Sequence, residues 1–269
     1  MRFYSPCLLL LSITILSCQT GKLKVIADIS NSLEEVSAAE TITGSSLIWT
    51  IEDSGNKNNL YGLDTKGSIV KDINIKGVKN IDWEDLTSDN EGNLYIGDFG
   101  NNSRKRKNLV IYKVKNVISL NKKIAIESIH FKMPEGIKSE DFEGFFLHNK
   151  HFYIFSKNDK KSILISVPNI AGNHVATFVT EFNLKGKKNR ITSADISPDG
   201  KTIVLLNHEK LWKLTNFDGD IFFEGNIESI PFEHDSQKEG ICFKDNTTVI
   251  ITDEYSKVTG SNIYEFKLD

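Results

Sequence analysis

The stretch "WEDLTSDNEGNLYIGDFGNN", Trp83 to Asn102, predicts a tight β-hairpin. Two short apolar runs flank the segment Asn90-Glu91-Gly92-Asn93, and Asn and Gly are the residues that hairpin turns favour. Carboxylates lie at both open ends of this hairpin, at Glu84-Asp85 and at Asp98. The pattern therefore indicates a hairpin whose open end is acidic.

The same pattern recurs along the chain. Each copy has a polar start, a short strand, a turn and a more apolar second strand, and the other copies begin at Ala39, Phe142, Ser193 and Lys238. Equivalent positions are separated by 44, 59, 51 and 45 residues when measured at Glu40, Glu84, Glu143, Ala194 and Glu239. A four-stranded propeller blade takes roughly 40–50 residues. The repeats therefore predict one blade per copy.

The last copy reaches Asp269 after only three strands. The fourth strand can come from the other end of the chain, where "LKVIADI", Leu23 to Ile29, precedes the first copy. An N-terminal strand that completes the last blade leaves no exposed sheet edge. We therefore predict an all-β fold, a five-bladed β-propeller closed by an N-terminal strand. A six-bladed propeller is the alternative, but it would need a sixth copy, which the sequence lacks.

The N-terminus has the features of an export signal. Arg2 precedes an apolar run, Leu8 to Leu16, that is too short to span a bilayer as a mature helix. The quartet Ile15-Leu16-Ser17-Cys18 resembles a bacterial lipobox, which implies cleavage before Cys18 and lipid attachment to that residue. The alternative is an ordinary signal peptide that ends by chance at a cysteine.

These features predict how the chain is divided and where it resides. We expect a signal peptide over residues 1–17, a lipidated tether over 18–22 and the β-propeller over 23–269. The mature chain would keep only Cys18 and Cys242, so no intrachain disulfide is expected. The predicted location is the cell envelope, with the lipid anchored in a membrane, the outer membrane being favoured. A net charge of −3 offers no basic excess for nucleic acid.

The acidic hairpin ends predict a cation site. In a propeller the first strand of each blade lines the central channel, so these ends should meet at one mouth. We expect an axial set at Glu40, Glu84, Glu143 and Glu239, and a ring just outside it at Asp53, Asp98, Asn158, Asn207 and Asp253. Two like charges 4 Å apart cost about 4 kcal/mol at an effective dielectric of 20, which protonation or a bound cation would relieve. Oxygen ligands without cysteine favour Ca²⁺ or Mg²⁺ over zinc, and an irregular ring suits Ca²⁺.

A second interpretation of these acids needs no ion. Carboxylates at strand starts also accept hydrogen bonds from backbone amides of neighbouring blades, and in that role they set the blade geometry.

Three segments carry a family resemblance. The motifs "EDLTSD…LYIGDFGNN", "DFEGF…YIFSKND" and "KEGICF…VIITDE" resemble the SdiA-regulated family of exported bacterial β-propellers, and they are similar to the calcium-dependent gluconolactonase and phytase-like propellers. In the lactonase group a Glu-Gly pair at a first-strand start supplies a metal ligand, and Glu143-Gly144 and Glu239-Gly240 match it. That group has proline at the next position, where this chain has Phe145 and Ile241, a departure that counts against lactonase activity.

Two functions remain open from the sequence. The first is a cell-envelope lipoprotein whose channel mouth holds a divalent cation and binds a small-molecule or protein ligand. The second is a calcium-dependent hydrolase of a lactone or phosphoester, with a metal-polarised substrate. His208, beside Asn207, is the only histidine near the predicted site and is the candidate general base.

The lipobox generates a direct prediction. Cys18→Ala removes the sulfur that would carry the lipid, and anchoring depends on acyl chains that contribute about 0.8 kcal/mol per buried CH₂. We expect the parent to fractionate with membranes and to carry the mass of a lipid, and the variant to be released. A variant that fractionates like the parent, together with a parent of unmodified mass, would exclude the anchor.

Overall fold

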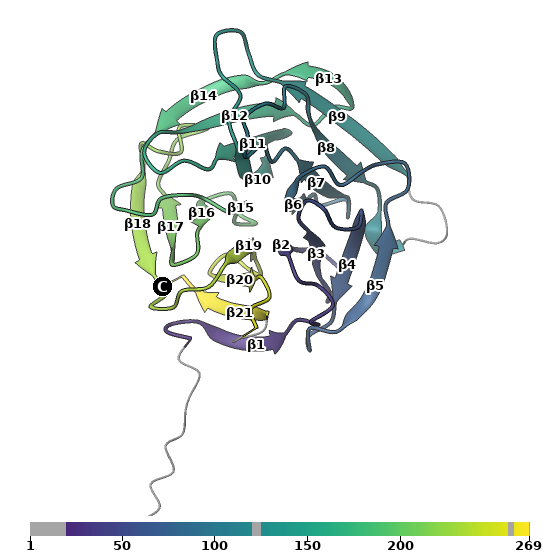
Figure 1. The fold of residues 1–269 in the computed structure, drawn as a ribbon. Helices are drawn as coiled ribbons and strands as arrows, with labels where there is room; N and C mark the ends of the chain where they lie inside the picture. Colours follow the sequence, from purple (N-terminus) through teal and green to yellow (C-terminus); the bar gives the residue numbers. More distant parts are fainter. Residues whose placement is uncertain (1–19, 120–124, 258–260, 269) are drawn as a thin grey trace, which may run out of the picture.

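The computed structural model describes residues 20–119, 125–257 and 261–268. Their strands form antiparallel sheets arranged as five blades around a central axis (Figure 1). This confirms the predicted five-bladed β-propeller. The described residues contain no α-helix, only the short 3₁₀ turn η1 (Val117–Ser119). No helix in these ranges is long and apolar enough to cross a bilayer.

Each blade has four antiparallel strands, and the first strand lies nearest the axis (Figure 1). Blade 1 contains β2 (Val36–Thr41), β3 (Ile48–Glu52), β4 (Asn59–Leu63) and β5 (Ile69–Asn74). Blade 2 contains β6 (Trp83–Ser88), β7 (Leu94–Asp98), β8 (Leu109–Val114) and β9 (Ile126–Lys132), with β13 (Gly172–Val175) added parallel to β9. Blade 3 contains β10 (Phe142–His148), β11 (His151–Ser156), β12 (Ser162–Pro168) and β14 (Thr177–Phe182). Blade 4 contains β15 (Ser193–Ile196), β16 (Thr202–Leu206), β17 (Lys210–Thr215) and β18 (Asn226–Pro231).

Blade 5 is closed by the N-terminal strand, as the sequence predicts. It contains β19 (Lys238–Phe243), β20 (Thr248–Asp253) and β21 (Asn262–Lys267), and β1 (Lys24–Asp28) pairs antiparallel with β21. Leu23, just before β1, is buried in the core between blades 4 and 5, whereas Ile29, just after it, is buried in the core between blades 5 and 1. The closing strand is therefore held at both ends. The predicted signal peptide and Cys18 lie outside the described residues.

The hydrophobic core is divided into five clusters, each between two neighbouring blades. Trp49 of blade 1 and Trp83 of blade 2 share one cluster, and Phe146 of blade 3 and Trp212 of blade 4 share another. These large side chains are almost fully buried. Because each blade buries a face against both neighbours, no blade has a complete core of its own.

The first strands approach one another closely near the axis. A Cβ atom on Gly144 would lie 2.7 Å from the Ser193 carbonyl carbon, and one on Gly240 would lie 2.3 Å from the Ala38 carbonyl carbon. Each glycine thus allows its strand to pack directly against the backbone of another blade. The glycine of each Glu-Gly pair therefore has a packing role.

Closure by β1 predicts a difference between two neighbouring apolar residues. Leu23→Ala removes a side chain that is 4% exposed and should cost about 2–5 kcal/mol. Val25 is 38% exposed, so Val25→Ala should change stability by less than about 1 kcal/mol. Thermal or denaturant unfolding measures both. Equal stability of the two variants would show that the start of β1 does not anchor blade 5.

Candidate functional site

Asp85 of β6 connects three blades at the axis. Its Oδ2 accepts hydrogen bonds from the N–H of Phe145 in blade 3, at 3.2 Å, and of Ala194 in blade 4, at 3.3 Å. Its Oδ1 accepts from the Ser193 hydroxyl at 3.0 Å and from the N–H of Leu86 at 2.9 Å. Asp85 is fully buried, and this burial raises the pKa of its carboxyl, while the donated hydrogen bonds act in the opposite direction.

The remaining blades complete this set of contacts. The hydroxyl that donates to Asp85 also accepts the N–H of Ile241 in blade 5, at 3.1 Å. Thr252 of blade 5 donates to the Ala38 carbonyl of blade 1, at 3.2 Å. Ser37 of blade 1 donates to the Glu84 carbonyl of blade 2. We call these contacts the axial ring, because they link all five blades in a closed circuit.

Carboxylates gather at the end of the channel where the first strands begin. Asp53, Asp82 and Glu84 each place a carboxylate oxygen within 4.8 Å of the others. Gly100 lies against them, since a Cβ there would be 1.8 Å from Glu84 Oε1 and 2.6 Å from Asp82 Cγ. Burial raises the pKa of all three acids, and neighbouring carboxylates add to the effect. We call this region, together with Glu143 and Glu239, the acidic mouth.

One lysine enters the acidic mouth. Lys157 Nζ lies 3.0 Å from Glu143 Oε2, and Glu143 shares a hydrogen bond with Glu84. Burial raises the pKa of Glu143 to about 8, although Lys157 opposes the shift. The pKa of Lys157 is raised mainly by Glu143, with Glu239 and Glu84 adding to it, against the effect of its own burial. A single ammonium group therefore interacts electrostatically with several carboxylates.

A histidine–carboxylate pair borders the same mouth. His208 Nε2 lies 2.8 Å from Glu239 Oε1, and 39% of the His208 side chain is exposed. Glu254 directly follows Asp253, which pairs with Lys238 at the start of β19, and burial and then the charge of Glu239 raise the pKa of Glu254 to about 8. His208 thus contacts Glu239, one of the predicted axial acids.

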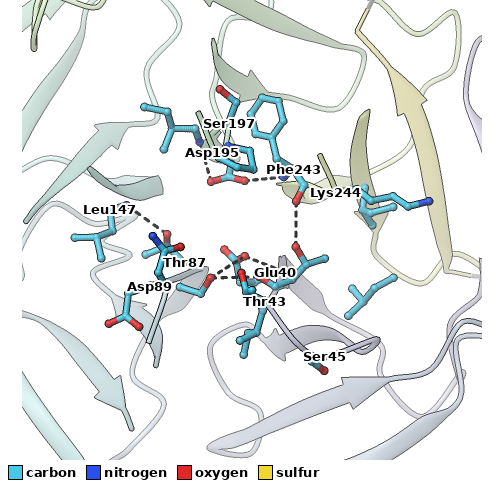
Figure 2. A pocket seen from close by; sticks show the side chains of 18 of the residues that line it. Glu40, Thr43, Ser45, Thr87, Asp89, Leu147, Asp195, Ser197, Phe243 and Lys244 are labelled. Carbon is cyan, nitrogen blue, oxygen red and sulfur yellow. Dashed lines mark hydrogen bonds between the residues drawn. The ribbon is translucent and has the colours of Figure 1, made fainter. Parts of the chain in front are cut away.

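Glu40 does not join the other glutamates, and its predicted place was wrong. Glu40 pairs across its hairpin with Trp49, which lies three residues before Glu52, the last residue of β3. Glu84, in contrast, comes directly after Trp83, which pairs with the last residue of β7. Glu40 therefore lies deeper in its hairpin and lines a cavity at the opposite end of the channel (Figure 2).

The predicted outer ring is also only partly formed. Asp53 lies at the acidic mouth, but Asp98 and Asp253 are fully buried within their blades. Asp98 forms an ion pair with Arg106 at 2.7 Å, and Asp253 accepts a hydrogen bond from the Tyr264 hydroxyl at 2.7 Å. Successive side chains of a strand point to opposite faces of the sheet. A carboxylate one residue further along the strand therefore lies inside the blade instead of at the channel mouth.

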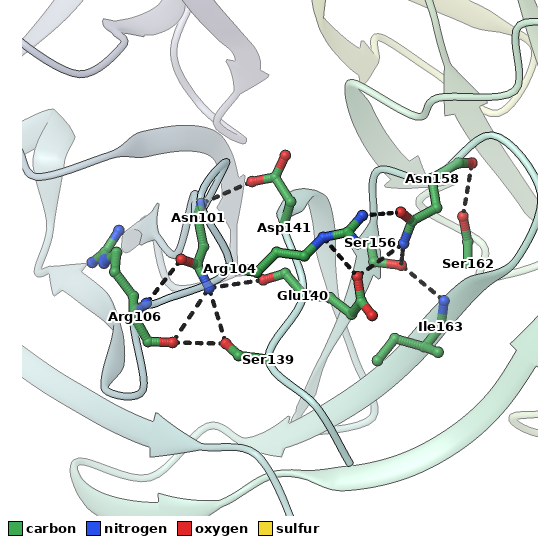
Figure 3. A network of polar contacts seen from close by, with 10 residues as sticks. All are labelled: Asn101, Arg104, Arg106, Ser139, Glu140, Asp141, Ser156, Asn158, Ser162 and Ile163. Carbon is green, nitrogen blue, oxygen red and sulfur yellow. Dashed lines mark hydrogen bonds and ion pairs between the residues drawn. The ribbon is translucent and has the colours of Figure 1, made fainter.

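The two asparagines of that ring bind loops instead. Asn158 accepts from Arg104 and donates to Glu140 at 3.2 Å, in the network between blades 2 and 3 (Figure 3). Asn207 donates to the Lys188 carbonyl at 2.5 Å, and its side-chain oxygen accepts the N–H of Glu209 at 3.0 Å. Their amides are therefore used to shape loops.

Sequence reasoning missed Asp82, Lys157 and Glu254. A signal for Asp82 is present in the chain, since "DWE" at residues 82–84 recurs as "DFE" at 141–143. The other two follow the last residues of β11 and β20 directly. Asp53 occupies the same position after β3. The position after the second strand, and not its last residue, therefore supplies the acidic mouth in these blades.

Solved structures share this architecture at low sequence identity. Glutaminyl cyclase of Myxococcus xanthus is similar with a TM-score of 0.59 and 11% identity, over 92% of this chain and 97% of that one. PQQ-bound aldose sugar dehydrogenase from Streptomyces coelicolor is similar with a TM-score of 0.53 and 9% identity, over 93% of this chain and 98% of that one. A chain of the nidogen/laminin complex is similar with a TM-score of 0.52 and 9% identity, over 88% of this chain and 77% of that one. No protein-family model and no curated protein matches the sequence significantly, so the likeness shows the propeller fold alone.

The raised pKa of Glu143 predicts a pH dependence of stability. The unfolded glutamate releases its proton near its ordinary pKa of about 4.3. The folded protein keeps that proton until the pH approaches about 8. Folding therefore takes up protons between these pH values. As the pH rises, this group should lower the free energy of unfolding of the metal-free protein by up to about 1.4 kcal/mol per pH unit.

Thermal unfolding in chelator from pH 5 to pH 8 measures this slope. Glu143→Gln should make the slope shallower, and the exposed control Glu135→Gln should retain the slope of the parent. A parent that gains stability across this range, or an equal slope in Glu143→Gln, would contradict the assignment.

Proposed function

We propose that this protein is a cell-envelope binding module whose acidic mouth holds a divalent cation, Ca²⁺, and uses it to engage a ligand. The observation that carries the proposal is the approach of Asp53, Asp82 and Glu84 within 4.8 Å, beside a glycine that leaves room for their carboxylates. Three carboxylates this close repel one another unless a cation or protons offset their charge.

The donor set fits Ca²⁺ better than the alternatives. Three carboxylates offer as many as six oxygens, and Ca²⁺ takes six to eight oxygen ligands in irregular geometry. No sulfur or imidazole belongs to this group among the described residues, which disfavours zinc. Lys157 forms its ion pair with Glu143, and within the described residues none of Asp53, Asp82 and Glu84 forms an ion pair. A bound Ca²⁺ would neutralise these acids and offer coordination positions to ligand oxygens.

The location belongs to the same proposal. The lipobox-like quartet that ends at Cys18 and the short tether over 18–22 would hold the propeller at a membrane surface. The motifs that resemble SdiA-regulated propellers contain Glu84, Glu143 and Glu239, and all three of these residues belong to the acidic mouth. This agreement supports placing the chain with that type of exported propeller.

The contact between His208 and Glu239 supports a second candidate function. A carboxylate that accepts a hydrogen bond from one imidazole nitrogen orients the ring and leaves the other nitrogen to act as a general base. Through its contact with Glu239, His208 lies at the same mouth as the proposed cation site, where a metal-polarised lactone or phosphoester could be hydrolysed. This is the calcium-dependent hydrolase that the sequence left open.

The cation proposal predicts a calcium-dependent melting temperature. An ion that binds only the folded state, at one hundred times its dissociation constant, adds about 2.7 kcal/mol. For a domain of this size, 1 kcal/mol corresponds to roughly 2–4 °C. Removing Ca²⁺ with a chelator should therefore lower the midpoint by about 5–10 °C, and Ca²⁺ should restore it better than Mg²⁺.

Two matched variants locate the ion. Glu84→Gln removes a proposed ligand and should shrink the calcium response. Glu40→Gln, at the opposite end of the channel, should keep the response in full. Equal midpoints of metal-stripped parent in Ca²⁺ and in chelator would leave the acids with a structural role only.

The hydrolase candidate has its own test. A panel of small lactones and phosphoesters is assayed with calcium-loaded parent and with His208→Gln. Turnover by the parent that is lost in the variant, while the calcium response of the melting temperature persists, would support catalysis. No turnover across the panel would favour the binding module.

A further inference from the structure

A cavity of about 920 Å³ lies at the opposite end of the channel from the acidic mouth. It is bordered by the turns that join the first two strands of four blades, and by the end of β19 in the fifth blade. Its volume is within the range of small-molecule sites. We call it the turn-side cavity; its lining includes Glu40, Ser45, Asp89, Leu147, Asp195, Ser197 and Phe243 (Figure 2).

The axial ring lies between this cavity and the acidic mouth. Along β6, Glu84 belongs to the acidic mouth, Asp85 is fully buried in the ring, and Thr87 and Ser88 line the cavity. The two ends of the channel are therefore separate binding regions.

Two buried carboxylates line the cavity, Glu40 with 6% and Asp195 with 9% of their surface exposed. Glu40 Oε1 accepts the N–H of Thr41 at 2.8 Å and the Ser88 hydroxyl at 3.3 Å, while Oε2 has no hydrogen-bond partner in the described part of the chain. Asp195 accepts the N–H of Ile196 at 2.8 Å and that of Phe243 at 2.7 Å. Both carboxylates point toward the centre of the cavity (Figure 2).

No positive charge in the described part of the chain forms an ion pair with these acids. Within residues 20–119, 125–257 and 261–268, neither Glu40 nor Asp195 forms an ion pair with a lysine, arginine or histidine. Lys244, at the rim, is paired with Glu265 at 2.6 Å. Burial raises the pKa of Glu40, and the charge of Asp195 raises it further. A cation supplied from solution would relieve this cost.

The form of the cavity favours an organic cation over a metal ion. Among the described residues, three carboxylates come within 4.8 Å of one another only at the acidic mouth, so Glu40 and Asp195 lack a third carboxylate ligand. The walls combine hydroxyls, such as Thr87 and Ser197, with apolar side chains, such as Leu147 and Phe243. Such a lining suits a molecule with both polar and apolar parts.

We propose that the turn-side cavity is a second binding site, which takes a small protonated amine whose ammonium group is held by the Glu40 and Asp195 carboxylates. The carboxylates provide charge-assisted hydrogen bonds, and the surrounding hydroxyls and apolar side chains contact the body of the ligand. This site is independent of calcium at the acidic mouth.

Calorimetric titration with matched probes tests the proposal. Putrescine and glucosamine carry an ammonium group, and butane-1,4-diol and glucose are their neutral counterparts. We expect the amines to bind and the neutral probes to bind at least about tenfold more weakly, the difference that one charged hydrogen bond makes. Glu40→Gln should weaken amine binding by a similar factor, and Glu84→Gln should leave it unchanged.

Circular dichroism confirms folding of each variant, and Asp195→Asn replaces Glu40→Gln if the latter fails to fold. Equal binding of amines and neutral probes would overturn the proposal, as would no amine binding up to tens of millimolar. Amine binding that is lost in Glu84→Gln but not in Glu40→Gln would also overturn it, because the amine would then occupy the acidic mouth.

Discussion

The hydrogen bonds that Asp85 accepts at the propeller axis are the constraint on which the rest of the structure depends. They join blade 2 to the first strands of blades 3 and 4, and the same Ser193 hydroxyl extends the connection to blade 5. Hydrogen bonds to charged groups contribute about 1.5–3 kcal/mol each, and a buried donor left without a partner costs about 1–3 kcal/mol. Because four first strands depend on one small cluster, their relative positions are fixed together.

This arrangement also explains why the channel has two different ends. Gly144 and Gly240 let the first strands meet around the axial ring, and the ring fills the space between the acidic mouth and the turn-side cavity. Acids on one side of it lie near Lys157 and His208, whereas Glu40 and Asp195 on the other side accept hydrogen bonds only from neutral donors among the residues that the structure describes. This difference is the basis for the two proposals, a metal ion at the acidic mouth and an organic ammonium ion in the turn-side cavity.

The sequence predicted the fold well because repetition and turn chemistry are local signals. The blade spacing, the hairpin turns and the closing strand at Leu23 to Ile29 could all be identified without any contact information. The assignment of acids to the mouth was less accurate, since it depends on register. Glu40 differs from Glu84 by its depth in the hairpin, and Asp98 differs from Asp53 by one position relative to the strand end. A difference of a single residue reverses which face a side chain occupies.

The acids of the channel fall into two groups with different contacts. Asp85 and Asp195 accept backbone N–H groups across blades, as interblade structural acids would. Asp53, Asp82 and Glu84 instead converge on one another. Periodicity alone could not separate these roles, because the separation arises from which strand faces each carboxylate.

The most direct test of the central claim is a crystal structure of the calcium-soaked protein, together with anomalous diffraction data from a second crystal in which Tb³⁺ replaces Ca²⁺. The account predicts one strong anomalous peak coordinated by the carboxylates of Asp53, Asp82 and Glu84. A crystal with no anomalous peak at the acidic mouth would contradict the account.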